Sequence, residues 1–282
     1  MPELPETETI AGDLRAEISG ATIKSVQVHR DDVLREITAN ALGTAATNSE
    51  IVRVWRRAKL VVLDVTQSRK NNNAFAHIVV QPRFTGALLL DDGTLPPDQM
   101  DYLTVTFALS DGRSLHYRDV RRLGTVSWMS SERFLAYSSK LGPEPLDPAL
   151  TNAVFSALVR GSKRPVKTLL MDQARLAGVG NIYANEALWR AGIDPSRVAS
   201  GISEQESATL LSGLREILCA SIKARGTSFR DYRDARGRRG EYVAQLAVYG
   251  RGGEQCLRCG RRLIETHAVD GRTTVFCAEC QR

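Results

Sequence analysis

The sequence predicts a multidomain α+β protein, with an N-terminal β-sandwich that begins with a helix, a helical second domain and a small C-terminal hairpin module. Three observations predict this. The 282 residues exceed the roughly 100–200 residues of one domain. Short apolar runs separated by turn signals fill residues 20–130, whereas helical periodicity dominates after residue 150. Four of the five cysteines cluster near the C-terminal end.

The N-terminal part is expected to form a helix followed by strands. A helical pattern from Thr7 to Ile18 ends before Gly20. The turn signals include Asp111-Gly112, and six short strands with such turns are typical of a sandwich or barrel. The expected strands are Ala21–Val28, Val52–Leu63, His77–Val80, Ala87–Leu90, Leu103–Leu109 and Thr125–Trp128.

A proline-rich segment separates the strands from the helices. Residues 141–148 contain three prolines and cannot form a continuous helix, so they indicate a linker. Cys219 falls within the apolar pattern of the last helix and is expected to be a buried thiol. The following Arg-, Asp- and Gly-rich stretch, residues 226–240, is expected to be a loop. The expected helices are Thr151–Val159, Val166–Met171, Ile182–Arg190 and Glu204–Lys223.

Composition excludes several classes of protein. The chain is 43% hydrophobic, 25% charged and 6% aromatic, which is ordinary for a globular protein and excludes a disordered or fibrous one. Apolar runs such as Ala87–Leu90 are far shorter than the roughly 20 residues that span a bilayer. The first ten residues carry three glutamates and no basic residue, unlike a secretory signal. We therefore expect a cytoplasmic protein with no membrane partner.

The charge distribution indicates a polyanionic partner. The net charge is +6, and residues 225–282 contain twelve arginines against seven acidic residues. A basic C-terminal region on a nearly neutral body fits a docking surface for phosphates, although a solvated charged face is the alternative.

The four C-terminal cysteines predict a metal site. Cys256, Cys259, Cys277 and Cys280 have the spacing C-x2-C-x17-C-x2-C, which is typical of two metal-binding knuckles. Four thiolates close a tetrahedral zinc site, so one structural Zn²⁺ is expected. Two disulfides are disfavoured in a cytosolic chain. His267 lies within the module and is expected at the surface or beside the ligands.

The N-terminus carries groups suited to covalent catalysis. Removal of Met1 would expose the secondary amine of Pro2. An α-amino group titrates near ~7.7–8 and is partly unprotonated at neutral pH. Secondary amines attack aldehydic carbons and form iminium ions, while Glu3 and Glu6 offer carboxyl groups for proton transfer. The alternative is a frayed acidic terminus.

Taken together, these motifs resemble the formamidopyrimidine-DNA glycosylase family from end to end and in the family's order. The Pro-Glu-Leu-Pro-Glu start is closer to the formamidopyrimidine branch than to the endonuclease VIII branch. The segments that carry the resemblance are residues 1–8, 56–59, 166–188, 248–251, the four-cysteine module with Gly271-Arg272, and Cys280-Gln281.

The resemblance implies a bifunctional DNA glycosylase and abasic-site lyase that removes oxidised purines, chiefly 8-oxoguanine and formamidopyrimidines, from damaged double-stranded DNA. It implies that Pro2 is the nucleophile and that Glu3 is the general acid/base. Glu6 would support the same site, and Lys59 would hold a phosphate or sugar oxygen. It also implies a bacterial-type, nucleoid-associated monomer.

DNA contacts follow from the same resemblance. Asn181, in a helix–two-turns–helix motif, and Arg272, in a zinc-finger β-hairpin, would bind the phosphates beside the lesion, and Tyr249 would also contact DNA. An asparagine amide and a guanidinium suit that task. Asn181 is also expected to be a helix N-cap.

Two stretches depart from the family pattern. Residues 81–86 replace the usual His-Leu-Gly-Met-Ser-Gly, so Phe84 is either a substitute wedge that fills the DNA stack or a core side chain. Residues 119–124 keep Arg121, which would address the opposite base, but carry Leu123 where the family has an aromatic residue. We therefore expect these changes to affect lesion and opposite-base preference more than catalysis.

The expected domains are a catalytic domain (residues 1–135), a linker (136–149), a helix–two-turns–helix domain (150–227), a lesion-side loop (228–247) and a zinc module (248–282). Three alternatives remain open: a glycosylase for an oxidised pyrimidine or a bulky or alkyl adduct, a non-catalytic protein that binds damaged DNA, and a zinc-ribbon protein that binds RNA or a ribosome.

Overall fold

The computed structural model describes residues 2–66 and 75–282. The chain divides into two compact units. The N-terminal unit comprises Met1–Ser139 and Ile222–Glu241, and the C-terminal unit comprises Lys140–Ser221 and Tyr242–Arg282. Within the described residues, every helix is too short or too polar to cross a membrane.

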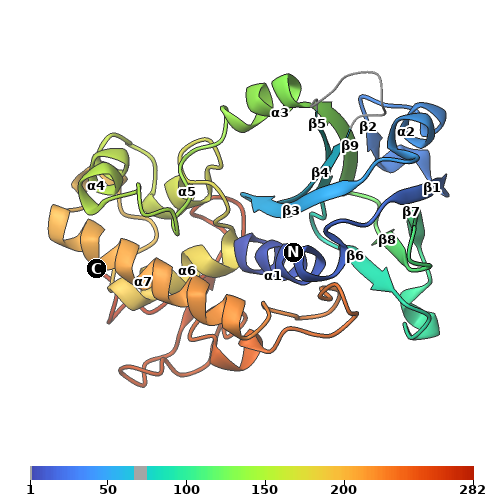
Figure 1. Cartoon of the computed structure of the whole chain (residues 1–282). Coiled ribbons are helices and arrows are strands. Elements are labelled where there is room, and N and C mark those ends of the chain that lie inside the picture. Colours follow the sequence, from blue (N-terminus) through green and yellow to red (C-terminus); the bar gives the residue numbers. More distant parts are fainter. Residues whose placement is uncertain (1, 67–74) are drawn as a thin grey trace. The chain divides into compact units, whose positions relative to one another are not determined.

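The N-terminal unit is a β-sandwich, which confirms the predicted fold class (Figure 1). Neighbouring strands are antiparallel, except for the short parallel pair β2 and β9. One sheet has the order β1 (Ile23–Val28), β7 (Leu103–Leu109), β8 (Ser114–Asp119), β6 (Gly86–Asp91). The other has the order β2 (Leu34–Arg35), β9 (Thr125–Ser130), β5 (Phe75–Gln81), β4 (Leu60–Thr66), β3 (Ile51–Arg57).

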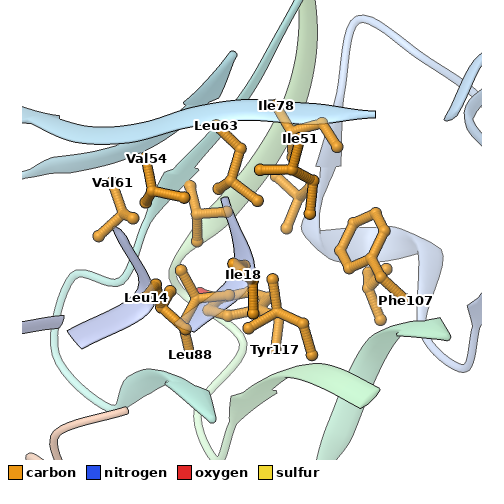
Figure 2. Packing of buried hydrophobic residues seen from close by; sticks show 14 of the residues in the cluster. Leu14, Ile18, Ile51, Val54, Val61, Leu63, Ile78, Leu88, Phe107 and Tyr117 are labelled. Atoms are coloured by element: carbon orange, nitrogen blue, oxygen red, sulfur yellow. The ribbon is translucent and has the colours of Figure 1, made fainter. Parts of the chain in front are cut away.

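The core of this unit combines both sheets with helix α1 (Leu4–Ile18). The helix packs against β3 and β4 and contributes Leu14 and Ile18, which recur on one face at helical spacing. Figure 2 shows these two side chains with Leu63 of one sheet and Phe107 and Tyr117 of the other. Burying each such side chain stabilises the fold by about 1.5–3 kcal/mol.

The strand expected over Val52–Leu63 is wrong, because the chain turns back within it. Strands β3 and β4 form a hairpin whose turn is Ala58-Lys59. Ala58 adopts a left-handed backbone, with φ of 53°. This conformation is uncommon for a residue other than glycine, so the sequence carries no turn signal at this position.

Four elements of the N-terminal unit were not predicted. They lack a strong periodic signal: β8 has only two apolar residues, Leu115 and Tyr117, among its six positions, and the helix after Thr38 consists mainly of small residues. Serine or threonine N-caps at Thr38 and Ser130 were the available cues for the two helices. The four elements are β2, β8, α2 (Ala39–Ala46) and α3 (Ser131–Ser138).

The C-terminal unit is helical and ends in a two-stranded hairpin, as predicted. Cys219 is exposed, so the expected buried thiol is wrong. Its neighbour Leu218 occupies the buried face instead. The helices are α4 (Asn152–Arg160), α5 (Val166–Met171), α6 (Asn181–Ala191) and α7 (Glu204–Lys223), and the strands are β10 (Ile264–Thr266) and β11 (Thr274–Phe276). Among the described residues, the 3-10 helices are Asp31–Val33, Pro97–Gln99, Ala199–Gly201 and Tyr242–Gln245.

Candidate active site and nucleic-acid interface

The N-terminus is an ordered, buried start of helix α1. The helix begins at Leu4, three residues earlier than expected, with Pro5 in its first turn and Glu3 as N-cap. Pro2 is buried, and Glu3 and Glu6 are only 1% and 0% exposed. The alternative of a frayed acidic terminus is therefore wrong. Met1, whose removal the proline amine requires, lies outside the described residues.

The Glu6 carboxylate holds this start in place. One oxygen accepts the backbone N–H of Glu3 at 2.8 Å, as part of a capping box. The other accepts the backbone N–H of Thr227, also at 2.8 Å. The Tyr232 hydroxyl donates to the Glu6 carbonyl at 3.3 Å. These bonds give Glu6 a positioning role, since they tie the first helical turn to the segment after α7.

The turn that carries Lys59 packs against the same end of α1. The Ala58 carbonyl accepts the Thr7 hydroxyl at 3.4 Å and the Arg56 guanidinium at 3.1 Å. Arg56 also donates to Glu8 at 2.8 Å. The fold thus brings the half-buried Lys59 and the Pro2–Glu6 segment to one region of the N-terminal unit.

The Arg-rich segment after α7 is held in place by a buried carboxylate. The buried carboxylate of Asp234 accepts the backbone N–H groups of Arg236 and Arg238, each at 2.9 Å, and pairs with Arg225. Arg225 also pairs with Asp13 of α1. This cluster fixes residues 225–240 to the helix whose first turn carries the candidate catalytic groups.

The predicted wedge residues lie at the surface of the N-terminal unit. Phe84 is 45% exposed and Leu123 is 39% exposed, so the reading of Phe84 as a core side chain is wrong. The Arg121 guanidinium lies 5.3 Å from the centre of the Phe84 ring, within range of a cation–π contact.

In the C-terminal unit, Asn181 joins helix α6 to the hairpin. Its amide donates to the Thr273 carbonyl at 2.9 Å, next to the exposed Arg272. Asn185, one turn further along, accepts the Val275 backbone N–H at 2.8 Å. Gly180 is the N-cap of α6 and Asn181 is its first residue, so the expected N-cap role of Asn181 is wrong.

Lys167 is a site residue that sequence reasoning missed. Its side chain is fully buried, and its ammonium donates to Asp270 at 3.1 Å, to the Thr273 carbonyl at 3.3 Å and to the Thr274 hydroxyl at 2.8 Å. Burial lowers the pKa of Lys167, and the Asp270 carboxylate opposes that shift. The available signal was a single charge within the otherwise uncharged helix α5. Lys167 therefore supports the turn that presents Arg272.

Lys167→Met is expected to destabilise the protein by about 3 kcal/mol, because the variant leaves Asp270 buried without its cation. DNA affinity should fall with it, since the Arg272 turn loses its support. Thermal unfolding and duplex binding would measure both effects, with the exposed Lys163→Met as the matched control. Unchanged stability would contradict the supporting role.

Tyr249 is held by a second buried charge. The carboxylate of Glu186, 3% exposed, accepts the backbone N–H groups of Ala247, Val248 and Tyr249 at 2.7–2.9 Å. Burial raises the pKa of Glu186, and the three backbone hydrogen bonds oppose that shift. Glu186 was also missed; its only signal is that it is the single acidic residue of α6.

The four predicted ligands converge. The sulfur atoms of Cys256, Cys259, Cys277 and Cys280 all lie within 4.8 Å of one another, so the cluster could hold a metal ion. All four are free thiols, and a tetrahedral Zn–S₄ site requires sulfur separations of about 3.8 Å. His267 is exposed and contacts the Thr273 hydroxyl at 3.2 Å, consistent with a surface position.

Comparisons with known proteins agree with this arrangement. Residues 1–126 match the formamidopyrimidine-DNA glycosylase N-terminal domain, and residues 141–233 match the formamidopyrimidine-DNA glycosylase H2TH domain. Proteins named formamidopyrimidine-DNA glycosylase from Xanthomonas campestris pv. campestris (strain B100) and Heliobacterium modesticaldum are 40% and 37% identical, each aligned over 100% of both chains.

A solved structure is similar throughout. The wild-type Lactococcus lactis Fpg (MutM), in complex with DNA containing N7-benzyl-Fapy-dG, superposes with a TM-score of 0.88 at 31% identity, over 100% of both chains. Full-length similarity at this level, together with the two domain matches, shows the family. The chain belongs to the formamidopyrimidine-DNA glycosylase family.

Proposed function

We propose that this chain excises oxidised purines from duplex DNA through a Schiff base at Pro2 and then cleaves the strand. Family membership makes it a DNA glycosylase of base excision repair with the abasic-site lyase activity inherent to the family. The observation that carries the mechanism is the buried Pro2–Glu6 start of α1 beside the Lys59 turn.

The first step is displacement of the base. The Pro2 nitrogen attacks C1′ of the damaged nucleotide, and the glycosidic bond breaks as the base leaves with a proton. Protonation of the ring oxygen and opening of the sugar ring then yield an iminium ion, the Schiff base of a secondary amine, between C1′ and the proline nitrogen. An enzyme that acts on a base in a duplex must extrude it, at a cost of a few kcal/mol.

Strand cleavage follows from the same intermediate. The iminium withdraws electrons and acidifies the C2′ proton, so a base can remove that proton and β-elimination expels the 3′ phosphate. A second, δ-elimination expels the 5′ phosphate, and hydrolysis returns the free amine. Glu3, adjacent to the nucleophile, is the general acid/base for ring opening and elimination.

Two other groups position these reactants. Glu6 accepts the Glu3 and Thr227 backbone N–H groups and so fixes the nucleophile's segment. Lys59 holds a phosphate or sugar oxygen of the damaged nucleotide, a role suited to an ammonium on a turn beside α1.

The C-terminal unit supplies the grip on DNA. Asn181 and Arg272 bind the phosphates that flank the lesion, and Tyr249 lies in the adjoining DNA-contacting segment. The four cysteines hold one structural zinc ion that keeps the hairpin folded. We assign residues 1–135 to the catalytic domain, 136–149 to the linker, 150–227 to the helix–two-turns–helix domain, 228–247 to the lesion-side loop and 248–282 to the zinc module. The protein acts as a monomer in the cytoplasm, at the nucleoid.

Phosphate contacts predict a steep salt dependence. If two to four phosphates are neutralised, the logarithm of the binding constant should fall with the logarithm of salt concentration at a slope of about −2 to −4. Arg272→Ala should make this slope shallower by about 1. Fluorescence anisotropy with a labelled duplex measures it, and Arg261→Ala, another exposed arginine of the module, is the control. A flat titration would argue against the proposed clamp.

Borohydride trapping tests the function as a whole. Duplexes carrying 8-oxoguanine opposite cytosine, and an abasic-site duplex, would be incubated with protein whose Met1 removal has been verified by mass. A covalent band on both supports the mechanism and the substrate together. Trapping on the abasic site alone would favour a glycosylase for an oxidised pyrimidine or a bulky or alkyl adduct. No band on either would favour a non-catalytic protein that binds damaged DNA.

A further inference from the structure

Two loops of the N-terminal unit present apolar side chains to solvent among arginines. The β5–β6 loop exposes Phe84, and the β8–β9 loop exposes Val120 and Leu123, each of the three at least 36% exposed. Arg83, Arg121 and Arg122 are exposed in the same two loops. Apolar side chains surrounded by guanidinium groups are suited to bind a nucleic acid whose base stack is opened. The bases can stack on the apolar side chains, and the phosphates can pair with the guanidinium groups.

A buried carboxylate joins the two loops. Asp119, the last residue of β8, is 1% exposed. One of its oxygens accepts the hydroxyl of Thr85 from the other loop. Its other oxygen accepts the Gly124 backbone N–H at 2.8 Å and the Tyr117 hydroxyl at 3.2 Å. The Arg121 backbone N–H completes the link, since it donates to the Thr85 hydroxyl oxygen at 3.0 Å.

Close packing supports the same junction. A Cβ atom on Gly124 would lie 1.9 Å from the Tyr117 hydroxyl oxygen, and one on Gly86 would lie 2.7 Å from it. Only glycine fits at these two positions, where the loops return to their strands. The tips also meet, because the Arg121 guanidinium lies over the Phe84 ring. The loops are therefore tied at the base by Asp119 and at the tip by a cation–π contact.

We propose that Asp119 is a positioning residue that makes these two loops a single preassembled wedge, and that this wedge determines how strongly the enzyme discriminates the base opposite the lesion. The inference rests on the proposed function. A wedge ordered before binding loses less conformational entropy when it enters the stack. It also holds Arg121 in one orientation, so that only an opposite base with matching hydrogen-bonding groups is accepted.

The first test is Thr85→Val, which keeps the side chain's shape but removes the hydroxyl that links the loops. Single-turnover excision of 8-oxoguanine opposite cytosine should slow about tenfold, the effect of one lost buried hydrogen bond. The ratio of excision rates opposite cytosine and adenine should shrink by a similar factor. Cleavage of a preformed abasic site, which has no damaged base to extrude, should stay within about twofold of wild type.

Further variants keep the test decisive. Asp119→Asn should reduce the excision rate and the cytosine-to-adenine rate ratio more than Thr85→Val does, because it removes more of the hydrogen bonds at the junction. Tyr117→Phe removes fewer of these hydrogen bonds and should have a smaller effect. Thr66→Val is the matched control: its hydroxyl accepts the Glu50 backbone N–H at 2.9 Å, at the end of β4 paired with the start of β5. Thermal unfolding of each variant verifies that it is folded.

The outcomes separate the two claims. A selective loss of lesion excision and of opposite-base discrimination in the linking variants supports the wedge. Equal losses on lesion and abasic substrates, or an unchanged discrimination ratio, would overturn it while leaving the glycosylase assignment intact. A wild-type protein inactive on both substrates would reject the proposed function, and the wedge with it.

Discussion

Replacing Pro2 with glycine is expected to abolish borohydride trapping on damaged duplexes or to reduce it by at least about a hundredfold, the scale of loss when a reacting group is misplaced by about an ångström. Glycine keeps a terminal amine, but it is a primary amine and lacks the pyrrolidine ring that fixes rotation about the N–Cα bond. The buried segment from Pro2 to Glu6 would then no longer hold the nitrogen in one orientation.

The measurement compares trapping with binding. Quantitative borohydride trapping on an abasic duplex and anisotropy on an uncleavable analogue would be run on the same preparation. DNA affinity should be largely retained, because the proposed phosphate contacts of Asn181 and Arg272 are unchanged. Pro97→Gly, at an exposed proline, controls for the substitution itself. Undiminished trapping by Pro2→Gly would make another amine the nucleophile.

Contiguous motifs were the predictable part of the site. Pro2, Glu3 and Glu6 lie within one short segment, and the spacing of the four cysteines alone indicates a candidate metal site. The fold class followed from short strands, a proline-rich break and helical periodicity, because each is a local signal. The hairpin at Ala58-Lys59 did not follow, because its turn uses a left-handed alanine rather than glycine.

Long-range polar partners could not be predicted. Lys167 forms a hydrogen bond with Asp270, 103 positions away in the sequence, and Glu6 forms one with Thr227, 221 positions away. The Asp119 carboxylate accepts a hydrogen bond from the Thr85 hydroxyl, which lies in the β5–β6 loop. Periodicity reports which face of an element is buried, but it carries no information on which distant polar group will satisfy a buried charge. These pairings are therefore visible only once the chain is folded.

Replacing Cys277 with alanine is expected to remove the bound metal, unfold the hairpin and weaken DNA binding by about two orders of magnitude, as the loss of two or three phosphate contacts would. The apolar core of the hairpin is too small to keep it folded without metal. Besides the buried cysteines, its buried apolar side chains include Leu263 and Val275. In such modules the affinity for zinc is folding free energy.

The experiment combines metal content, folding and binding. Zinc per chain would be measured alongside duplex affinity, with Cys219→Ala as the control because Cys219 lies outside the cluster. The Trp189 indole donates to the Cys256 sulfur at 3.4 Å, so the contribution of Trp189 to the tryptophan fluorescence reports on the module. Normal DNA binding by metal-free Cys277→Ala would contradict the structural role of zinc.

Since Arg272 is presented by this hairpin and supported by Lys167 from α5, loss of the metal and loss of the Lys167 ammonium should affect DNA binding through the same turn. Their combined effect should therefore be smaller than the sum of the two.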